Sequence, residues 1–175
     1  RCDGAGQALY DEGVTGLALL AFLRAGDVTP GVRKGLDFLI ASQEAGGRFG
    51  TVRTQHFIYN SAIATWALSE GFARTRDKRY EAAAQLGLDY LEKARNPYLA
   101  WRYGERSGEN DTSVTCWCVQ ALAAGQRAGL RVDKGSFGGA RAWPDKRTGP
   151  AAGQVGYIVR GGAPARPQDL VDRFP

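Results

Sequence analysis

Two acidic residues, Glu109 and Asp111, lie in the most polar stretch of the sequence, SGENDTSVT at residues 107–115. A carboxyl group becomes a strong general acid when apolar surroundings raise its pKa and keep it protonated. The stretch also immediately precedes an apolar segment with helical spacing. Asp111 or Asn110 could therefore cap a helix instead, by accepting a hydrogen bond from a backbone N–H two or three residues later. The sequence leaves both roles open for Asp111 and favours capping.

The three cysteines and the single histidine, His56, do not form a metal-binding pattern. Cys116 and Cys118 are two residues apart on a predicted helix, so their side chains diverge and cannot bridge one another. Cys2 has no obvious partner. We interpret the cysteines as small buried apolar residues rather than reactive thiols. We expect no zinc site of the Cys/His type and no other cofactor.

Aromatic residues form a second group with chemical potential. Trp66 and Trp117 lie on two predicted helices and could line a cavity, where an indole ring stabilises a positive charge. Packing in the core is the simpler interpretation. Tyr98, Trp101 and Tyr103 lie instead in a loop with several charged residues, ahead of a predicted helix. That loop is predicted either to form the rim of a binding site or to pack against its own helix.

The elements that must position these residues repeat along the chain. The clearest copy is KGLDFLIASQEAGGRFG at residues 34–50, a helix that ends in a glycine-containing turn. Its defining positions are Gly35, Phe38, Gln43, Gly47 and Phe49, and Gly35 shares a helical face with Phe38. A second copy has Gly87, Tyr90 and Trp101, and a third has Ala140, Trp143 and Tyr157. The spacing of about 50 residues indicates a repeat architecture.

Another predicted helix precedes each copy, and these helices align with one another. The alignment places Asp11, Asn60 and Asp111 at one equivalent position, and Leu17, Trp66 and Trp117 at another. Each unit is therefore a predicted helical hairpin, and neighbouring hairpins must stack because one hairpin cannot bury both of its apolar faces. We predict helices over residues 11–25, 30–43, 56–72, 77–95 and 111–126. A sixth, within 134–147, contains three glycines and Pro144, so we expect it to be short or broken.

Composition limits the fold class and the partners. Of 175 residues, 43% are hydrophobic and 23% are charged, which is ordinary for a globular domain. The sequence has no apolar run of the roughly 20 residues that a membrane span needs. The net charge is +5, but the densest basic run, at 73–79, is interpreted as a solvated loop and not as a nucleic-acid site. We predict an all-α domain over 1–160 and a Gly/Pro/Arg-rich linker over 161–175.

The pattern K-G-x-x-F-L-x-x-x-Q-x-x-G-G-x-F resembles the QW motif of squalene–hopene cyclases and related triterpene cyclases. Phe49 stands where the family has tryptophan. The alternating helices of residues 9–160 also resemble the prenyltransferase/squalene-oxidase repeat. This resemblance implies an α/α toroid, a ring that closes with about six hairpins. The three hairpins seen here would then form an incomplete toroid with open ends.

The resemblance also implies what an enzyme of this kind would need. Squalene–hopene cyclases protonate an alkene with an aspartate of a DxDDTA motif. In SGENDTSVT, Asp111 and Thr112 match the end of that motif, but Asn110 stands at the position of the protonating aspartate. Protein prenyltransferase β-subunits hold zinc through Asp, Cys and His. Asp111 fits that aspartate, whereas Ser113 replaces the cysteine.

We therefore expect a non-catalytic binding or scaffolding domain of a longer, bacterial-type protein. Its apolar inner groove would take a hydrophobic ligand or a protein partner. The alternative is an isoprenoid-cyclase-like enzyme with a degenerate acid motif, in which Asp111 or Glu109 is the acid. The open ends of the toroid are expected to self-associate or to bind a partner, because repeat proteins do not leave apolar end faces uncovered.

Overall fold

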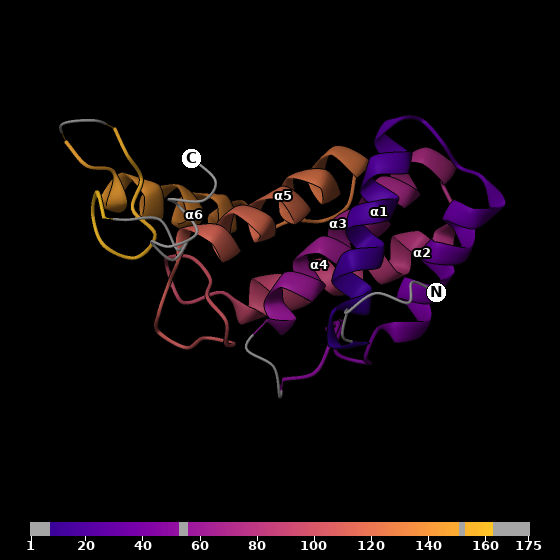
Figure 1. Ribbon diagram of the computed structural model, residues 1–175, viewed down its shortest axis with the longest axis horizontal. Coiled ribbons are helices and arrows are strands. Elements are labelled where there is room, and N and C mark those ends of the chain that lie inside the picture. The colour runs from indigo at the N-terminus through magenta and orange to yellow at the C-terminus, as the bar shows by residue number, and fades with distance from the viewer. Residues whose placement is uncertain (1–7, 53–55, 151–152, 163–175) are drawn as a thin grey trace, which may run out of the picture.

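The computed structural model describes residues 8–52, 56–150 and 153–162 (Figure 1). In this part of the chain the regular elements are helices, so the all-α prediction is confirmed. They are the 3-10 helix η1 (Ala8–Tyr10) and the α-helices α1 (Asp11–Arg24), α2 (Pro30–Ser42), α3 (Phe57–Thr75), α4 (Lys78–Ala94), α5 (Thr112–Ala128) and α6 (Lys134–Arg147). Among the helices described, none is both long and apolar enough to cross a membrane.

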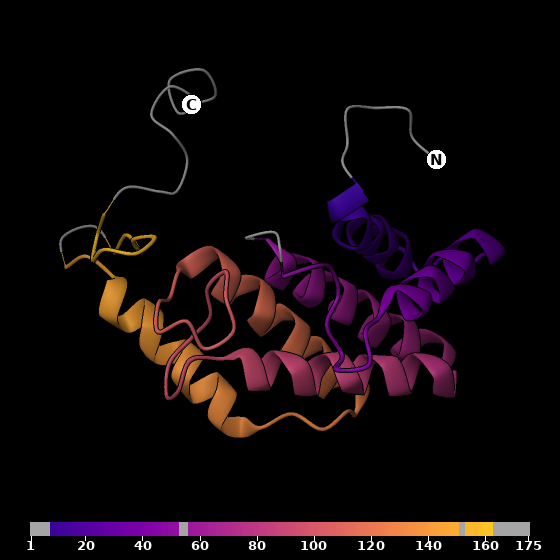
Figure 2. The same ribbon diagram turned by 90° about the horizontal axis from the view of Figure 1, so that it is seen from below.

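The six α-helices alternate between two layers. α3 packs between α1 and α5, and these three helices form the first layer. α2, α4 and α6 each follow one of them and lie in the second layer (Figure 2). Three successive helical hairpins thus stack side by side, as the repeat predicts. Two hydrophobic clusters fill the space between layers, one around Leu36 and Leu68 and the other around Leu88 and Leu122.

Three predicted helix starts are confirmed by their side-chain caps. Thr29 accepts a hydrogen bond from the Val32 N–H at 3.4 Å, and Pro30 follows it as the first helical residue. Asp77 accepts from the Arg79 N–H at 2.9 Å. Asp111 accepts from the Val114 N–H at 2.8 Å. These contacts satisfy amide donors that a helix terminus leaves unpaired.

The glycine-containing turn after α2 ties three helices together. Gln43 ends α2 and donates through Nε2 to the carbonyl oxygens of Gly47 (3.2 Å) and of Ala83 in α4 (2.9 Å). Phe49 is fully buried, and its N–H and C=O both bond to Ser61 Oγ in α3 at 3.0 Å. Gly47 has φ +90°, and a Cβ atom there would lie closer to the Leu86 carbonyl than the 3.0 Å that real Cβ contacts keep. The turn therefore requires glycine at this position.

The second turn repeats this arrangement with different residues. Trp101 is buried, and its N–H and C=O both bond to Thr115 Oγ1 in α5 at 3.4 Å. Arg95 ends α4 as Gln43 ends α2, and it donates to the Leu99 carbonyl at 3.5 Å. Here the close approach of turn and helix has its glycine on the helix, because Gly139 of α6 faces the Leu99 carbonyl. Both junctions bring a turn close to a helix, but the glycine lies in the turn at the first junction and in the helix at the second.

Because Ser61 and Thr115 make the same pair of bonds, they mark equivalent positions of α3 and α5. Asn60 immediately precedes Ser61, whereas Asp111 lies four residues before Thr115. The prediction that Asp11, Asn60 and Asp111 share one position is therefore wrong for Asp111. By the same shift, Trp117 is equivalent to Ile63, so the predicted equivalence of Trp66 and Trp117 is also wrong. Asn60 lies inside α3 and donates to the Leu9 carbonyl at 2.7 Å, and Asp11 makes no cap. A slip of about one helical turn returns to the same helix face, so the apolar pattern could not reveal it.

The prediction for the sixth helix is also wrong, because α6 is continuous from Lys134 to Arg147. Asp133 caps it by accepting from the Gly135 N–H at 2.9 Å. Trp143 is buried and Pro144 lies in the last turn, where its carbonyl accepts from the Thr148 N–H and hydroxyl. Burial of an aromatic ring and two capped ends outweigh the low helix propensity of the sequence.

Phe38 departs from its counterparts in the other hairpins. Its side chain is 40% exposed, whereas Tyr90 and Trp143 are buried. Gly35 does face the core, where a Cβ atom would lie 2.8 Å from Leu19. The first hairpin therefore has the close contact at Gly35 but lacks a buried aromatic side chain at the position of Tyr90 and Trp143.

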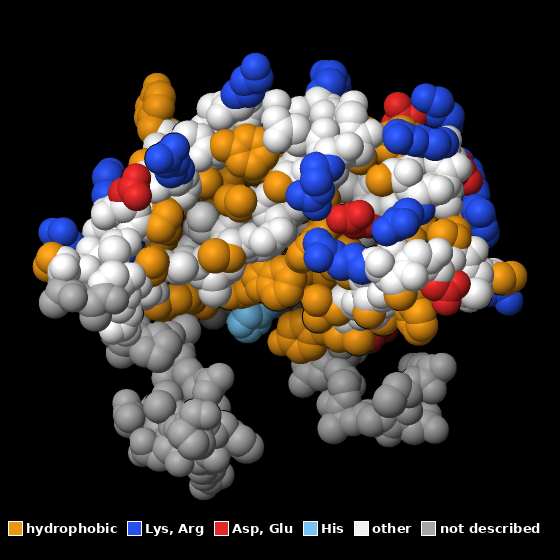
Figure 3. All heavy atoms as spheres, turned by 90° about the horizontal axis from the view of Figure 1, so that it is seen from above, with side chains coloured by type: hydrophobic (Ala, Val, Ile, Leu, Met, Phe, Trp, Pro, Cys, Tyr) orange, Lys and Arg blue, Asp and Glu red, His pale blue; other side chains and the backbone are white. Residues whose placement is uncertain are grey.

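The segment after α6 folds back onto the start of α5. The Thr112 N–H donates to the Tyr157 carbonyl at 3.1 Å, and its hydroxyl donates to the Gly156 carbonyl at 2.8 Å. Apart from its first two residues, the predicted linker 161–175 lies outside the described residues. On the face shown in Figure 3, Lys and Arg side chains are spread apart instead of forming one patch.

Candidate functional site

Three tyrosine hydroxyls meet where α3 and α5 begin. The Tyr59 hydroxyl lies 2.6 Å from Ser113 Oγ, and the Tyr103 and Tyr157 hydroxyls are hydrogen-bonded to each other. Tyr59 comes from α3, Tyr103 from the loop before α5, and Tyr157 from the segment that folds back after α6. We call Tyr59, Tyr103, Tyr157 and Ser113 the tyrosine cluster. It joins parts of the chain that are far apart in sequence.

Asp111 lies beneath the tyrosine cluster and is fully buried. Its Oδ1 accepts hydrogen bonds from the Val114 N–H at 2.8 Å and from Ser113 Oγ at 2.9 Å. Its Oδ2 has no hydrogen-bond partner, and Arg102 Nε lies 3.9 Å from it. The carboxylate thus caps α5 and orients Ser113 through Oδ1, while its buried Oδ2 makes no hydrogen bond and only a long ion pair with Arg102.

Glu109, the other candidate acid, lies on the surface. Its side chain is exposed and pairs with Arg102 Nη1 at 2.9 Å. The Arg102 guanidinium in turn lies over the Tyr103 ring, 5.3 Å from its centroid. Glu109 therefore lacks the apolar surroundings that keep a carboxyl group protonated.

Asn110, at the position of the protonating aspartate in the cyclase motif, fixes the loop. Its Oδ1 accepts from the Ala100 N–H at 3.0 Å and from Asn96 Nδ2 at 3.1 Å. Asn96 Oδ1 accepts from the Gly108 N–H at 2.8 Å. The two buried amides hold residues 96–110 in one shape. The sequence pattern did not indicate this role of Asn96, which follows the end of the predicted helix 77–95.

The surroundings keep the Tyr59 and Tyr157 hydroxyls protonated. Burial raises the pKa of Tyr59 to about 12, and the negative charge of Asp111 acts in the same direction. Burial also raises the pKa of Tyr157, together with its hydrogen bond to Tyr103. At neutral pH the cluster therefore presents neutral hydroxyl groups, which can both donate and accept hydrogen bonds.

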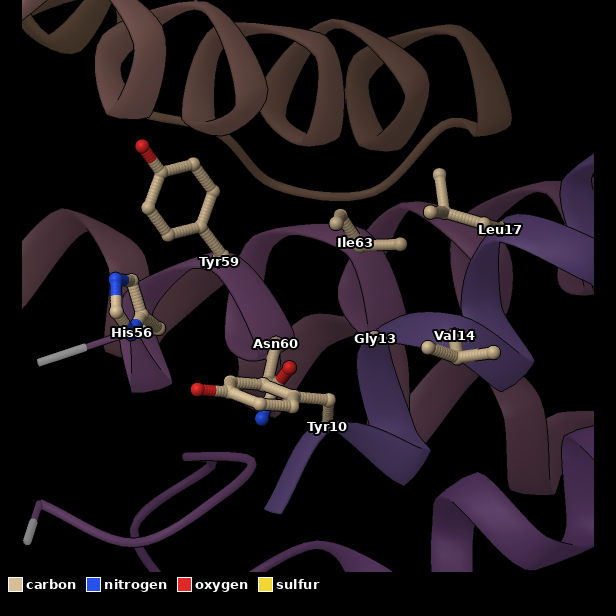
Figure 4. A pocket seen from close by; sticks show the side chains of 8 residues that line it. All are labelled: Tyr10, Gly13, Val14, Leu17, His56, Tyr59, Asn60 and Ile63. Carbon is tan, nitrogen blue, oxygen red and sulfur yellow. The ribbon is translucent and has the colours of Figure 1, made fainter. Parts of the chain in front are cut away.

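A shallow hollow of about 320 Å³ adjoins the tyrosine cluster between α1 and α3 (Figure 4). Its lining consists of Tyr10, Gly13, Val14, Leu17, His56, Tyr59, Asn60 and Ile63. Figure 4 shows the Tyr59 ring directed toward α5, with His56 beside it. The His56 ring lies 5.8 Å from that of Tyr103 and 6.1 Å from those of Tyr10 and Tyr59, between centroids.

The apolar surface continues along α3 and α5 beyond the hollow. Trp66 lies about one turn after Ile63, and its ring centroid is 6.1 Å from that of Trp117. Val14 and Leu17 are 62% and 46% exposed, respectively. We call Tyr10, Val14, Leu17, Ile63, Trp66 and Trp117 the apolar face. An edge of the molecule rich in hydrophobic side chains is visible in Figure 3.

Charged groups end the apolar face on the side away from the tyrosine cluster. Glu70 accepts from Trp66 Nε1 at 3.2 Å and from Arg127 at 3.3 Å. The Arg24 guanidinium lies 5.0 Å from the Trp66 ring centroid. The surface therefore has an apolar middle, a hydroxyl-rich end and a charged end.

The five aromatic residues predicted to contact a ligand or partner divide into two groups. Trp66, Trp117 and Tyr103 lie on the apolar face or in the tyrosine cluster. Trp101 is buried and donates through Nε1 to the Leu91 carbonyl at 2.7 Å, so it belongs to the core. Tyr98 is 91% exposed and does not line the hollow.

Most residues of the site were not predicted as binding residues, among them Leu17, His56, Tyr59 and Tyr157. A signal for His56 and Tyr59 was present. His56, Tyr59, Ile63 and Trp66 recur at intervals of three and four residues, which places them on one helical stripe.

Within residues 8–52, 56–150 and 153–162, no three His, Cys, Asp or Glu side chains gather as a metal site requires. Cys118 is buried as expected, whereas Cys116 is exposed, so the expectation of a buried residue is wrong for Cys116. Partial desolvation of the Cys116 thiol and full burial of the Cys118 thiol raise the pKa of both, which keeps them protonated and poorly nucleophilic. Cys2 lies outside the described residues.

No family model, curated protein or solved structure matches this chain significantly. The similarity to terpenoid-cyclase repeats therefore depends on the motif residues alone, and function is argued from the geometry of the site.

Proposed function

We propose that this chain is a non-catalytic binding domain, an arc of an α/α toroid whose apolar face holds an elongated hydrophobic molecule. The observation that carries the proposal is the exposure of apolar side chains beside a polar cluster. Val14 and Leu17 remain largely exposed next to Ile63, Trp66 and Trp117. Covering such a surface is favourable by about 25 cal/mol for each Å² removed from water, and contiguous exposed apolar surface marks a binding site.

The tyrosine cluster supplies the polar end of the proposed site. Neutral hydroxyl groups of Tyr59, Tyr103 and Tyr157 suit an alcohol or amide head group, which needs both donors and acceptors. A ligand with an apolar tail and one such head group would place its tail on the apolar face and its head group at the tyrosine cluster. The hollow is open to solvent, which suits reversible binding.

Two observations favour binding over acid catalysis. Asp111 Oδ1 accepts from a backbone N–H and from Ser113 Oγ, which is the behaviour of a structural carboxylate. The other candidate acid, Glu109, is exposed and ion-paired. A protonating carboxyl group needs an enclosed apolar site instead.

An isoprenoid-cyclase-like enzyme is the second candidate, and one observation favours it. Asp111 is fully buried among aromatic residues, and its Oδ2 lacks a hydrogen-bond partner. Buried ionisable groups with unsatisfied atoms occur at catalytic sites. This candidate requires Asp111 to carry a transferable proton.

Tryptophan fluorescence can test the binding proposal, because Trp66 and Trp117 lie on the apolar face whereas Trp101 and Trp143 are buried. We expect geranylgeraniol to change the emission saturably in the wild-type chain. Leu17→Asp should weaken binding at least about tenfold, since it places a charge on the apolar floor. Tyr98→Ser is the matched control, an exposed aromatic outside the site, and should bind as wild type does. Equal affinity of Leu17→Asp and wild type would contradict the proposal.

Product analysis by mass spectrometry separates the two candidates. The chain is incubated with squalene or geranylgeraniol, and the organic extract is examined for cyclised isomers. The binding proposal predicts unchanged substrate. A cyclised product that is formed by the wild type and lost in Asp111→Asn would establish the enzyme instead.

A further inference from the structure

A second apolar depression, about 420 Å³ in volume, lies between α5 and α6 at the end of the hairpin stack. Cys116, Val119 and Gln120 line it from α5, and Phe137, Ala140 and Arg141 line it from α6. It is separate from the apolar face, which lies on α1, α3 and the side of α5 that carries Trp117. We call this depression the end groove.

The preceding grooves in the same stack show what fits such a site. The groove between α3 and α4 is filled by α5, whose Gly125 approaches Leu88 so closely that a Cβ atom would lie 2.5 Å from it. The groove between α1 and α2 is filled by α3, whose Gly71 approaches Leu36 in the same way, at 2.8 Å. Each groove thus receives the first helix of the next hairpin.

The helices that fill these grooves use one stripe of residues. In α3 the stripe is Ile63, Ala67 and Gly71, and in α5 it is Trp117, Ala121 and Gly125. The alignment that pairs α1 with α3 places Val14, Ala18 and Phe22 at the corresponding positions of α1. All three are exposed in the structure, Phe22 at 51%. The stack therefore ends in a groove of the kind that receives such a stripe, and begins with an exposed stripe.

We propose that the end groove receives the exposed stripe of α1 from a second copy of this chain, so that copies associate head to tail. The contact continues the interfaces that α3 and α5 already make within the chain. It shares Val14 with the apolar face but does not require the ligand proposed for that face. Because the two surfaces differ, the contact is heterologous and builds chains or rings instead of a closed symmetric dimer.

The side chains at the two ends of the stack can form a cation–π pair. In α2 and α4, the residue after Gly35 and Gly87 is a leucine, and this leucine contacts the glycine of the helix that fills the groove. In α6, the residue after the equivalent Ala140 is Arg141. α1 has Phe22 where α3 and α5 have that glycine. An arginine can extend over a phenylalanine ring and stack on it.

The directions of the helices would also bring opposite charges of the two copies together. α5 begins beside the end of α6, since Trp143 Nε1 donates to Thr112 Oγ1 at 3.1 Å. An α1 helix docked parallel to α5, as α5 lies parallel to α3, would bring Asp11 and Glu12 toward the last turn of α6. That turn carries Lys146 and Arg147. Opposite charges there would favour the proposed orientation.

Sedimentation equilibrium on the full 175-residue chain tests the proposal. We expect the weight-average mass of the wild type to rise with concentration between about 5 and 500 μM, the range of weak association. Phe22→Asp blocks the stripe and Cys116→Arg blocks the groove, and both substitutions are at exposed positions. Each variant alone should remain monomeric. An equimolar mixture should form a heterodimer, because one partner keeps an intact stripe and the other an intact groove.

Cys116 provides a second readout inside the end groove. In a Cys2→Ser background, the reaction of Cys116 with a neutral maleimide should slow severalfold as protein concentration rises. Phe22→Asp should abolish this protection, and Tyr98→Asp, which changes an exposed residue outside both surfaces, should retain it.

Three results would overturn the proposal. The wild type could remain a monomer at the highest concentration, which would also be the outcome if the groove took a small apolar molecule or another segment of its own chain. The two variants could fail to associate when mixed. Either variant alone could dimerise, which would indicate a symmetric contact through another surface. Loss of geranylgeraniol binding would affect none of these measurements, so the two proposals fail separately.

Discussion

The buried carboxylate of Asp111 caps a helix and also supports the tyrosine cluster. Its Oδ1 stabilises the first turn of α5, and the same oxygen holds Ser113 under the Tyr59 hydroxyl. The structure of the tyrosine cluster therefore depends on the helix cap. A change at Asp111 is expected to act on stability and on the cluster together.

Two substitutions at Asp111 separate its acceptor role from its charge. Asp111→Ala should lower the free energy of unfolding by about 1–2 kcal/mol, because the Val114 N–H loses its partner at a helix N-terminus. Asp111→Asn keeps an oxygen acceptor and should cost less. Urea unfolding followed by circular dichroism measures both, and Asp133→Ala, at the exposed cap of α6, is the control for capping alone. An equal loss in the two variants would show that the charge, which both remove, matters more than the acceptor, which only Asp111→Ala removes.

The raised pKa of Tyr59 predicts a stability change at alkaline pH. The pKa of the Tyr59 hydroxyl is about 12 in the folded state, whereas the pKa of a tyrosine in an unfolded chain is about 10. Between these values the unfolded state binds fewer protons than the folded state, so the free energy of unfolding falls as pH rises. Tyr59→Phe should make this fall shallower, as measured by urea unfolding at pH 9, 10 and 11. An unchanged slope would mean that Tyr59 titrates normally in the folded chain.

At the scale of the helices and turns, the two hairpin junctions share one contact but differ in where the glycine lies. At the first junction the turn supplies Gly47 against the Leu86 carbonyl. At the second the helix supplies Gly139 against the Leu99 carbonyl. The fold requires a close approach between the backbones of turn and helix. The glycine that permits this approach can lie on either of the two elements.

Matched glycine substitutions test the first junction. Gly47→Ala should destabilise the chain by at least about 2 kcal/mol, because φ is +90° and the new Cβ atom meets a carbonyl. Gly46→Ala is the control, since no atom lies within 4 Å of a Cβ atom there and its φ is not positive. Thermal and urea unfolding measure the difference. Similar stability of the two variants would refute the close approach.

The same comparison applies to α6. Gly139→Ala should destabilise the chain, because its Cβ atom would meet the Leu99 carbonyl. Gly138→Ala has open space and should stabilise the helix by about 0.5–1 kcal/mol. Opposite signs in urea unfolding are the expected result. A stabilising Gly139→Ala would mean that α6 does not pack on the second turn.

The sequence predicts helix positions well where local signals are strong. Thr29, Asp77 and Asp111 identify three helix starts, and Gln43, Gly47 and Phe49 identify the first turn. It fails for α6, because Trp143 and the capped ends supply stability that propensity does not contain. It also misaligns α5 with α3, because a shift of one turn preserves the apolar face and only the bonds of Ser61 and Thr115 reveal it.

The candidate site could be predicted only in part, for a related reason. Asp111, Trp66 and Trp117 stand out by residue type, and each does lie in or near the site. Tyr157 could not be found, since it reaches the tyrosine cluster only when the segment after α6 folds back onto Thr112. Trp101 stands out equally, but its indole N–H bonds to Leu91 inside the core. Residue type indicates which groups can bind, and only the packing of the three hairpins decides which of them face outward.

At the scale of the whole molecule, stability should depend on the two ends of the stack. In a repeat protein the stability is roughly a sum of hairpin terms and of interfaces between neighbours. The described chain has two such interfaces, α1/α2 with α3 and α3/α4 with α5, and a groove and a stripe that the proposed association would join. Burying them between copies adds a further interface for each contact and stabilises the folded state by mass action.

The midpoint of thermal unfolding should therefore rise with protein concentration in the wild type. Free partner at ten times the dissociation constant adds about 1.4 kcal/mol, which corresponds to a few degrees for a chain of this size. Calorimetry at about 10 and 500 μM measures the shift, in the range of weak association. Phe22→Asp should remove the concentration dependence without lowering the midpoint of the dilute protein, because Phe22 is 51% exposed in the single chain. A midpoint that is independent of concentration in the wild type would mean that the end groove and the α1 stripe stay uncovered by copies of this chain. The hairpin stack would then have to be stable with both surfaces exposed to water.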